Sequence, residues 1–432
     1  MTTSHSIFAE GTDGEGLPLP PMRRATWWLL GSLYTTQSVA LMFFVGAFVA
    51  ILREQGASFE RISLIYMIGL VWPFKCLWAP LVDRFRFGAL GHYRGWLMLM
   101  QTGMVATLIL LATLDPERAF SQVYSLCLLL AVLSATQDIA VDGLACRLLP
   151  EAQRGLGNGI QIAGGLLGTL LGAGAVLIAY RHVGWRGSME ILAAVTAVSL
   201  FQLLAFREPR FATMQRSTFS MARRFVTFWW RPGGLHWLLL VSLYTVGSSF
   251  AYAILTPVLI DAGWTLERVG WVVNVLGSVV GVAAAMVSGW LVSLLGRRRA
   301  LIWAAGLQCV GVAAIAILMA VEHSDAVRIL AVCLYFFCYN PAAVVLATLM
   351  MDRAGTDSPA TDYTLQFSVN QCFALGMVSA GAALAAPFGY QGVMALAGVT
   401  ALLAIVLALL YRDRISFEDR GMAPTLASEE AA

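Results

Sequence analysis

The chain has 432 residues, of which 59% are hydrophobic and only 12% are charged. Water-soluble domains carry about 25% charged residues, so this composition excludes an ordinary soluble globular protein. The formal net charge of +3 gives no argument for a nucleic acid as a partner. The composition therefore predicts a protein whose solvent is the lipid bilayer.

Two polar tails enclose a long apolar region. The first, residues 1–25, is rich in Gly, Pro, Thr and acidic residues, which predicts a disordered segment with no cleavable signal peptide. Residues 412–432 predict a second tail of the same kind. Twelve apolar stretches lie between the tails, and each has at least the ~20 residues that a helix needs to cross a bilayer. We expect helices because lipid offers no hydrogen bonds to an open backbone. The stretches are 27–52, 61–82, 95–114, 119–149, 155–180, 187–206, 235–260, 268–294, 300–321, 326–351, 361–386 and 391–411.

Two short sequences recur about 210 residues apart. GSLYT at 31–35 returns as VSLYT at 241–245, and QGASFERIS at 55–63 returns as AGWTLERVG at 262–270. Such a repeat indicates that the chain consists of two related halves. Two parallel halves are typical of transporters that rock around a substrate site near the midplane of the membrane.

The repeat divides the apolar region into two bundles. We expect an all-α membrane protein with twelve transmembrane helices in two pseudo-symmetric six-helix bundles, residues 26–206 and 234–411. Residues 207–233 contain six arginines and would connect the bundles as a basic linker. If the N-terminus is cytoplasmic, 20 arginines fall on the cytoplasmic side and seven on the other. This positive-inside bias predicts that the linker and both termini are cytoplasmic.

Two loop sequences carry a family resemblance. Residues 79–88, APLVDRFRFG, and their counterpart 289–298, GWLVSLLGRR, each retain part of the pattern G-x-x-x-D-R-x-G-R-R. The first keeps the Asp-Arg pair, and the second keeps the glycines and the final arginines. The whole layout thus resembles the major facilitator superfamily, which implies transport by alternating access.

Three further segments resemble one branch of that superfamily. FKCLWAPLVDRF at 74–85 and the QDI-x-x-D element within 135–165 are similar to the branch of muropeptide permeases and acetyl-CoA transporters. RGLGNGIQ at 154–161 looks most like bacterial inner-membrane siderophore permeases of the rhizobactin and ferripyochelin type. The resemblance implies a multi-pass inner-membrane importer for an iron–siderophore complex. The alternatives are import of a muropeptide or another organic solute, and siderophore export.

Three ionisable residues lie inside apolar stretches. Asp138 and Asp142 are four residues apart and share a helix face, and Lys75, the only lysine of the chain, falls at a similar depth. A lone charge at the centre of a membrane helix costs about 2.5–3.5 kcal/mol on insertion scales. We therefore expect the three side chains to face one another or a water-filled cavity.

One lysine beside two carboxylates leaves an excess acid that can take up a proton. We expect Asp138 or Asp142, set against Lys75, to couple proton movement to transport. A purely structural gate and direct contact with the substrate are the alternatives. Asp83, Arg84 and Arg147, at the ends of their stretches, are predicted to close a cytoplasmic gate.

Other polar side chains inside the stretches are candidates for the wall of a substrate cavity. They are Tyr34, Gln37, Asn158, Gln161, Tyr244, Tyr252, Tyr339, Asn340, Gln366 and Asn370. All five histidines fall in loops or at helix ends, so no base lies at depth for a membrane enzyme, and the duplicated halves argue against a channel. We expect a monomeric transporter of a small organic solute and protons, with no cofactor or metal.

Overall fold

The computed structural model describes residues 22–209, 221–319 and 324–411, and all of its regular elements are helical. The predicted tails lie mostly outside these residues, as does part of the predicted linker. The first half contains α1 (Arg24–Met42), η1 (Phe43–Phe48), α2 (Val49–Glu54), α3 (Phe59–Ile68), α4 (Val71–Phe74), η2 (Lys75–Leu77), α5 (Ala79–Arg84), η3 (Gly88–Leu90), α6 (Tyr93–Ala112), α7 (Phe120–Leu148), α8 (Glu151–Thr169), η4 (Leu170–Ala175) and α9 (Val176–Ala205).

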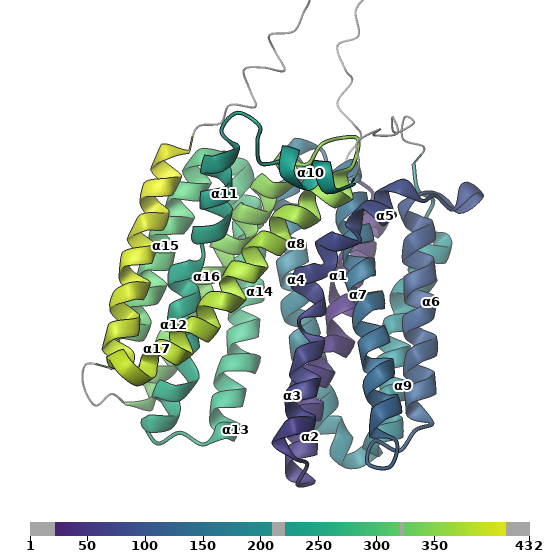
Figure 1. The fold of residues 1–432 in the computed structure, drawn as a ribbon, viewed down its shortest axis with the longest axis horizontal. Coiled ribbons are helices and arrows are strands. Elements are labelled where there is room, and N and C mark those ends of the chain that lie inside the picture. The colour runs from purple at the N-terminus through teal and green to yellow at the C-terminus, as the bar shows by residue number, and fades with distance from the viewer. Residues whose placement is uncertain (1–21, 210–220, 320–323, 412–432) are drawn as a thin grey trace, which may run out of the picture.

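The second half follows a short linker helix, α10 (Met221–Thr227). Its elements are α11 (Gly234–Leu243), α12 (Val246–Asp261), α13 (Leu266–Val269), η5 (Gly270–Leu276), α14 (Gly277–Leu295), α15 (Arg297–Ile317), α16 (Asp325–Arg353) and α17 (Pro359–Leu410). Figure 1 shows the two halves side by side, the first at the right and the second at the left, with α10 at one end of the molecule. We call that end, drawn at the top, the linker end.

Nine helical stretches among the described residues are long and apolar enough to cross a membrane. The two longest, Glu151–Ala205 and Pro359–Leu410, have 55 and 52 residues. Each contains a glycine with non-helical backbone angles, Gly184 at φ 64° and Gly389 at φ 66°. Both glycines fall in gaps that the sequence predicts between helices, and Figure 1 shows α17 as two limbs that meet at the end opposite the linker end.

Positive backbone φ angles repeat between the halves. Gly56 and Gly263 have φ values of 77° and 86°, and Gly184 and Gly389 are similarly matched, about 205 residues apart in each case. Only glycine adopts this region without strain, so the same turn is built at equivalent places. Ser58 and Thr265 then cap the next helices by accepting a backbone N–H. The duplicated pattern seen in the sequence is therefore also present in the backbone.

The sequence predicts one helix over 61–82, and this prediction is wrong in detail. The stretch is broken into α3, α4, η2 and α5, and Lys75 lies on the 3-10 turn η2. Pro73 and Pro80 cause the interruptions, because proline lacks the N–H that an α-helix needs and clashes with the preceding turn. The break places Lys75 in the interior of the protein, where its side chain is fully buried.

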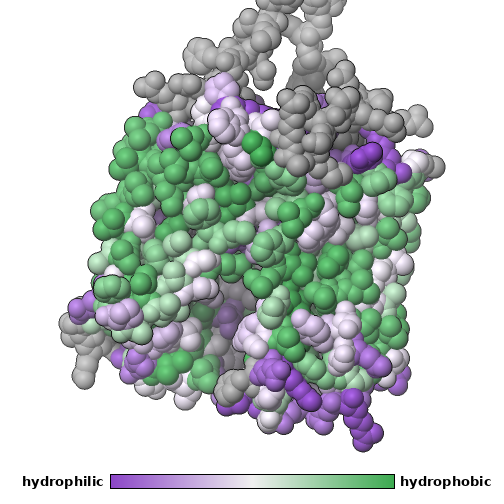
Figure 2. All heavy atoms as spheres, in the orientation of Figure 1, coloured by the Kyte–Doolittle hydropathy of each residue, from purple (hydrophilic) through white to green (hydrophobic). Residues whose placement is uncertain are grey.

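The outer surface has the polarity of a membrane protein. Figure 2 shows apolar residues over the sides of the molecule and hydrophilic residues gathered at its two ends. Large exposed apolar side chains on the long helices include Phe201, Trp290 and Leu402. The same view shows a recess at the lower middle, at the end opposite the linker end.

The two halves are in close contact along α8 and α14. A Cβ atom on Gly155 would lie 2.7 Å from the carbonyl oxygen of Gly289, and one on Gly159 would lie 2.9 Å from that of Ala285. Small residues let helix backbones approach this closely inside a membrane. Farther along α8, Gly164 and Gly168 contact α1 in the same way. This helix therefore packs against both its own half and the other.

Candidate functional site

The three predicted intramembrane charges meet in the first half. The Lys75 ammonium forms an ion pair with Asp138, and both side chains are buried. The amide nitrogen of Gln37 on α1 donates to the Asp138 Oδ1 atom over 2.6 Å. Aromatic rings enclose the lysine, with Nζ 4.9 Å from the Trp72 ring centroid and 4.6 Å from that of Phe367. Asp138 is therefore neutralised by a cation that is itself shielded from lipid.

Asp142 has a different environment, one helical turn away. Its Oδ1 atom accepts hydrogen bonds from the Tyr34 hydroxyl at 3.0 Å and from the Gln161 amide nitrogen at 2.8 Å. Its Oδ2 atom is buried and has no hydrogen-bond partner among the described residues. Within the same residues, Asp142 also forms no ion pair. A buried carboxylate oxygen without a partner is costly when it is charged, so this carboxyl group differs in kind from Asp138.

Polar side chains of α7 near these carboxylates form hydrogen bonds to the backbone of α1. The Ser134 hydroxyl donates to the Gln37 carbonyl at 2.6 Å, and the Gln137 amide donates to the Leu33 carbonyl at 3.0 Å. Gln101 on α6 in turn donates to Gln137 at 2.9 Å. These bonds hold α1 and α7 in register, which sets the directions of Asp138 and Asp142.

The second half reaches this cluster through α17. The Tyr363 hydroxyl lies 2.8 Å from the Gln161 Oε1 atom and 3.2 Å from the Asn158 Oδ1 atom. One turn farther along, the Phe367 ring lies over Lys75. Sequence reasoning missed both aromatic residues. Their i, i+4 spacing on one face of an amide-containing helix was the available signal.

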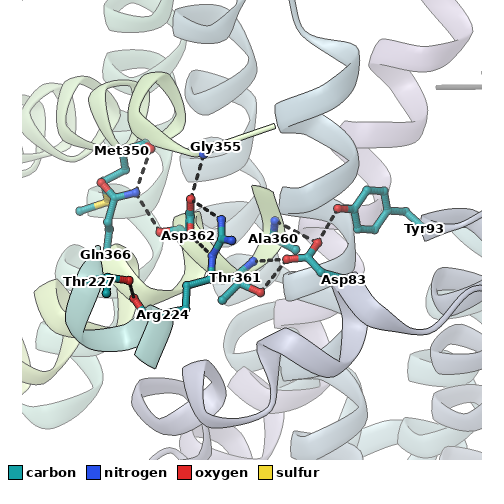
Figure 3. A network of polar contacts seen from close by, with 10 residues as sticks. All are labelled: Asp83, Tyr93, Arg224, Thr227, Met350, Gly355, Ala360, Thr361, Asp362 and Gln366. Atoms are coloured by element: carbon teal, nitrogen blue, oxygen red, sulfur yellow. Dashed lines mark hydrogen bonds and ion pairs between the residues drawn. The ribbon is translucent and has the colours of Figure 1, made fainter. Parts of the chain in front are cut away.

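Asp83 lies at the linker end, as the gate prediction required, but its partner is a helix terminus. It accepts hydrogen bonds from the backbone N–H of Thr361 at 2.7 Å, from the hydroxyl of Thr361 at 2.6 Å and from the Tyr93 hydroxyl at 2.7 Å. The N–H of Ala360 adds a longer bond of 3.4 Å. The carboxylate of the first half thus caps the first turn of α17 (Figure 3), where backbone N–H groups and the helix dipole favour negative charge.

The linker helix is attached to the same turn of α17. Arg224 of α10 makes two hydrogen bonds to the buried Asp362 carboxylate, at 3.0 and 3.1 Å. The backbone N–H of Gly355 also donates to Asp362 at 3.0 Å (Figure 3). The first turn of α17 is therefore held by the first half on one side and by the linker on the other.

A second ionic contact joins the halves at the linker end. Asp352, at the end of α16, pairs with Arg154 of α8 at 2.9 Å and with Arg297 of α15 at 2.7 Å. Arg297 also donates to the Glu151 carbonyl of α8 at 2.6 Å. Arg84, predicted for the gate, is exposed and makes no hydrogen bond or ion pair with another described residue, whereas Arg147 is half-buried. The contacts of Asp83 and Asp352 are thus made without Arg84.

The predicted cavity residues divide between the halves. Those of the first half, Tyr34, Gln37, Asn158 and Gln161, all belong to the charge cluster. Those of the second half are mostly bonded within it. The Tyr244 hydroxyl donates to the Leu301 carbonyl, Asn340 to Phe336, Gln366 to Met350 and Asp362, and Asn370 to Val241 and Thr245. These four support packing of the second half in this conformation.

Tyr252 and Tyr339 are the remaining predicted cavity residues. Each of their rings stacks on the ring of Tyr335, with centroid separations of 6.3 and 6.0 Å and interplanar angles of 22° and 2°. The Tyr335 hydroxyl donates to the Ser248 carbonyl at 2.9 Å, while no described residue bonds the hydroxyls of the other two. The three rings form an aromatic cluster on α12 and α16 of the second half. Among the described residues, no group of three or more His, Cys, Asp or Glu side chains could hold a metal ion.

The fold and the buried charges define a multi-pass membrane protein whose halves close on a polar core. The sequence matches the family described as Major Facilitator Superfamily over residues 29–377. The chain belongs to the major facilitator superfamily. The superfamily resemblance of the sequence is therefore confirmed.

Two curated relatives are described as a permease and a putative transporter. The chain is 29% identical over 264 residues to the anhydromuropeptide permease of Escherichia coli (strain K12), which covers 60% of this chain and 53% of the permease. It thus spans about half the length of that relative. It is 20% identical over 405 residues to the putative transporter AmpG 3 of Rickettsia typhi, covering 90% of this chain and 96% of the relative. Neither is described as a siderophore permease, so the siderophore expectation stays a prediction.

Solved structures share the fold at low sequence identity. A bacterial homologue of the iron transporter ferroportin in an outward-facing state aligns with a TM-score of 0.65 at 17% identity, covering 90% of this chain and 99% of that one. The human organic anion transporter MFSD10 (TETRAN) aligns with a TM-score of 0.70 at 16% identity, covering 90% and 100%. At these identities the likeness concerns the fold alone.

Proposed function

We propose that this protein imports a muropeptide-type organic solute across the bacterial inner membrane, driven by protons. The observation that carries the proposal is the buried cluster of Lys75, Asp138 and Asp142, which lies in one half and is touched by the other. Burying ionisable residues inside a membrane protein costs free energy. Such residues usually mark substrate or proton pathways. The similarity to an anhydromuropeptide permease supports the class of solute.

The proposal includes a complete membrane topology. The 55-residue and 52-residue helical stretches are each about twice the length that a crossing needs. We count each as two crossings divided at Gly184 and Gly389, and the broken helix from Phe59 to Arg84 as one more. Twelve crossings in two bundles of six result, with residues 207–233 as the linker. The arginine bias supports a cytoplasmic linker end and cytoplasmic termini.

The closed linker end and the recess at the opposite end together correspond to an outward-facing state. The recess admits solute from the periplasm, and the Asp83 and Asp352 contacts then break as the cytoplasmic side opens. Alternating access of this kind needs two halves that separate at one end at a time. Glycines of α8 and α14 provide the tight, small-residue contact about which the halves move.

We propose that Asp142, and not Asp138, exchanges the proton. Asp138 is ion-paired with Lys75 and accepts a hydrogen bond from Gln37, so both of its oxygens have partners. Asp142 forms no direct ion pair among the described residues and keeps one buried oxygen unbonded, although Lys75 also lies near it. Binding of one proton would remove the incompletely compensated charge of this carboxyl group and so favour a different packing around it.

The segment 154–161 carried the resemblance to siderophore permeases. In the structure, its residues support the choice of a muropeptide over a siderophore only indirectly. Its glycines Gly155 and Gly159 contact α14, and Asn158 and Gln161 bond to Tyr363. Each of these roles concerns the joining of the two halves, so none is specific to an iron chelate. We therefore favour the muropeptide class over a siderophore.

Uptake by the purified protein in liposomes tests the proposal. A labelled anhydromuropeptide should accumulate when the outside is made acidic, and an excess of the unlabelled compound should prevent it. A panel of ferric siderophores serves as the competing arm. Accumulation of a siderophore, with no uptake of the muropeptide, would reverse the choice of solute. Absence of uptake for both would remove the proposed function.

A further inference from the structure

A chain of hydrogen bonds connects Asp142 to the second half. The Asp142 Oδ1 atom accepts from the Gln161 Nε2 atom at 2.8 Å, and the Gln161 Oε1 atom accepts from the Tyr363 hydroxyl at 2.8 Å. The three residues belong to α7, α8 and α17, and all three side chains are buried or nearly so. This chain is therefore a continuous polar path from the proposed proton site across the boundary between the halves.

The orientation of the Gln161 amide determines what the path can transmit. An amide has a donor side and an acceptor side, and here the donor side faces the carboxylate while the acceptor side faces the tyrosine. A charged carboxylate strengthens the first bond, and polarisation along the chain strengthens the second. A proton added to Asp142 removes the charge, and both bonds weaken. The state of Asp142 thereby changes how firmly α8 is joined to α17.

Other ionisable groups also face Asp142. They are Tyr34 on α1, Lys75 on η2, Cys146 on α7 and Tyr363 on α17, while Asp138 lies one helical turn away on α7. Tyr34 bonds the same carboxylate oxygen but belongs to the first half, as do Lys75 and both remaining α7 residues. Tyr363 is the one member of this set that belongs to the second half.

We propose that Tyr363 is the positioning residue through which the second half senses the proton on Asp142. The inference rests on the proposed proton coupling at Asp142 and adds the route by which that coupling reaches the rocking motion. With Asp142 charged, the Tyr363 hydroxyl is held by Gln161 and the halves stay closed around the cluster. With Asp142 neutral, this attachment loosens and α17 is free to move.

The hydroxyl and the ring of Tyr363 make different contacts, so a substitution can remove one and keep the other. Its ring stacks on Phe367 with a centroid distance of 6.3 Å and an interplanar angle of 18°. A Tyr363→Phe variant keeps this stacking and removes only the hydroxyl, with its bond to Gln161 and its longer contact to Asn158. Tyr335→Phe is a matched control, because the Tyr335 hydroxyl is also buried but donates to the Ser248 carbonyl within the second half. A Gln161→Met variant breaks the same path at its centre with a side chain of similar length.

The experiment compares two readouts in proteoliposomes, solute exchange at equal pH and accumulation driven by a pH gradient. Tyr363→Phe should keep exchange but lose its dependence on pH, and its accumulation should fall at least about fivefold, the lower range of a typical coupling between sites. Tyr335→Phe should match the wild type in both. Gln161→Met should behave as Tyr363→Phe does, and it decides the question if Tyr363→Phe does not fold.

The outcomes distinguish this inference from the proposed function. If the wild type accumulates solute and both path variants keep its pH profile and its accumulation, Tyr363 only packs and the inference is overturned. If the wild type itself shows no accumulation driven by a pH gradient, the proposed proton coupling fails, and the inference fails with it. A Tyr335→Phe variant that loses coupling as Tyr363→Phe does would also overturn the assignment, since loss of any buried hydroxyl would then suffice.

Discussion

The carboxylate of Asp83 in the first half binds both the backbone N–H and the side-chain hydroxyl of Thr361 in the second, at 2.7 and 2.6 Å. Thr361 lies in the first turn of α17, where backbone N–H groups have no partner within the helix. A residue of one half therefore supplies the cap of a helix in the other. When the halves separate at the linker end, the hydrogen bonds of this cap must break.

Replacement of Asp83 by alanine should shift the protein toward a state that is open at the linker end. Loss of a capping side chain costs about 0.5–2 kcal/mol, and here only the closed state would bear that cost. Distances between spin labels at the linker ends of α5 and α17 measure the shift. Asp115→Ala, at an exposed loop carboxylate, is the control. Unchanged distance distributions in Asp83→Ala would contradict the role of the cap.

The glycine contact between α8 and α14 predicts a steric effect. A side chain at position 159 would meet the Ala285 carbonyl oxygen at 2.9 Å and the Gly289 Cα atom at 3.2 Å, and backbone atoms cannot give way cheaply. Gly159→Val should therefore prevent full closure of the linker end and reduce transport severely. Gly306→Val, on α15, is the control because nothing lies within 4 Å of its added Cβ atom. Normal transport by Gly159→Val would show that the contact is dispensable.

The two membrane aspartates should differ in their effect on stability. Asp138→Asn leaves the buried Lys75 ammonium without its partner, and breaking such a pair costs roughly 3–5 kcal/mol. Asp142→Asn removes no ion pair seen among the described residues, so its loss should be clearly smaller. The midpoint of thermal unfolding in detergent measures both. A combined Lys75→Met and Asp138→Asn variant should recover part of the loss, and equal destabilisation by the two single variants would argue against the distinction.

His92 predicts how stability responds to acid. It lies just before α6, where burial, with Arg86 and Arg147 nearby, lowers the pKa of its imidazole to about 4. The unfolded chain binds a proton near pH 6.5, so the folded state loses stability as the pH falls from that value toward 4. His92→Gln should reduce the fall in unfolding midpoint between pH 7 and pH 5. His182→Gln, at an exposed histidine, should leave the fall unchanged, and an equal fall in wild type and His92→Gln would contradict the prediction.

The charge cluster could be predicted from the sequence, because the free-energy cost of burying a side chain depends on its residue type. Lys75, Asp138 and Asp142 could be expected to meet once all three fell at similar depth. The partners of Asp83 could not be foreseen in this way, since the backbone N–H groups of α17 leave no mark in the sequence. The expectation that opposite charges pair with each other pointed instead to Arg84, whose side chain is exposed.

The second half shows the same limit for polar residues. Gln366 and Asn370 have the spacing of a cavity face, yet their amides are used by carbonyl and hydroxyl groups of neighbouring helices. Tyr363 and Phe367, close to them on α17, reach the charge cluster of the first half. Only the packing of α17 against the first half decides which of these residues faces the cluster. Helix periodicity alone does not fix that direction.

Proton movement that accompanies solute entry tests the central claim most directly. Proteoliposomes that contain a pH-sensitive dye are given an anhydromuropeptide on the outside with no imposed pH gradient. The account predicts that wild-type protein acidifies the interior as solute enters, and that Asp142→Asn exchanges solute without acidification. Solute entry through the wild type with no change in internal pH, or acidification by Asp142→Asn at the wild-type rate, would contradict it.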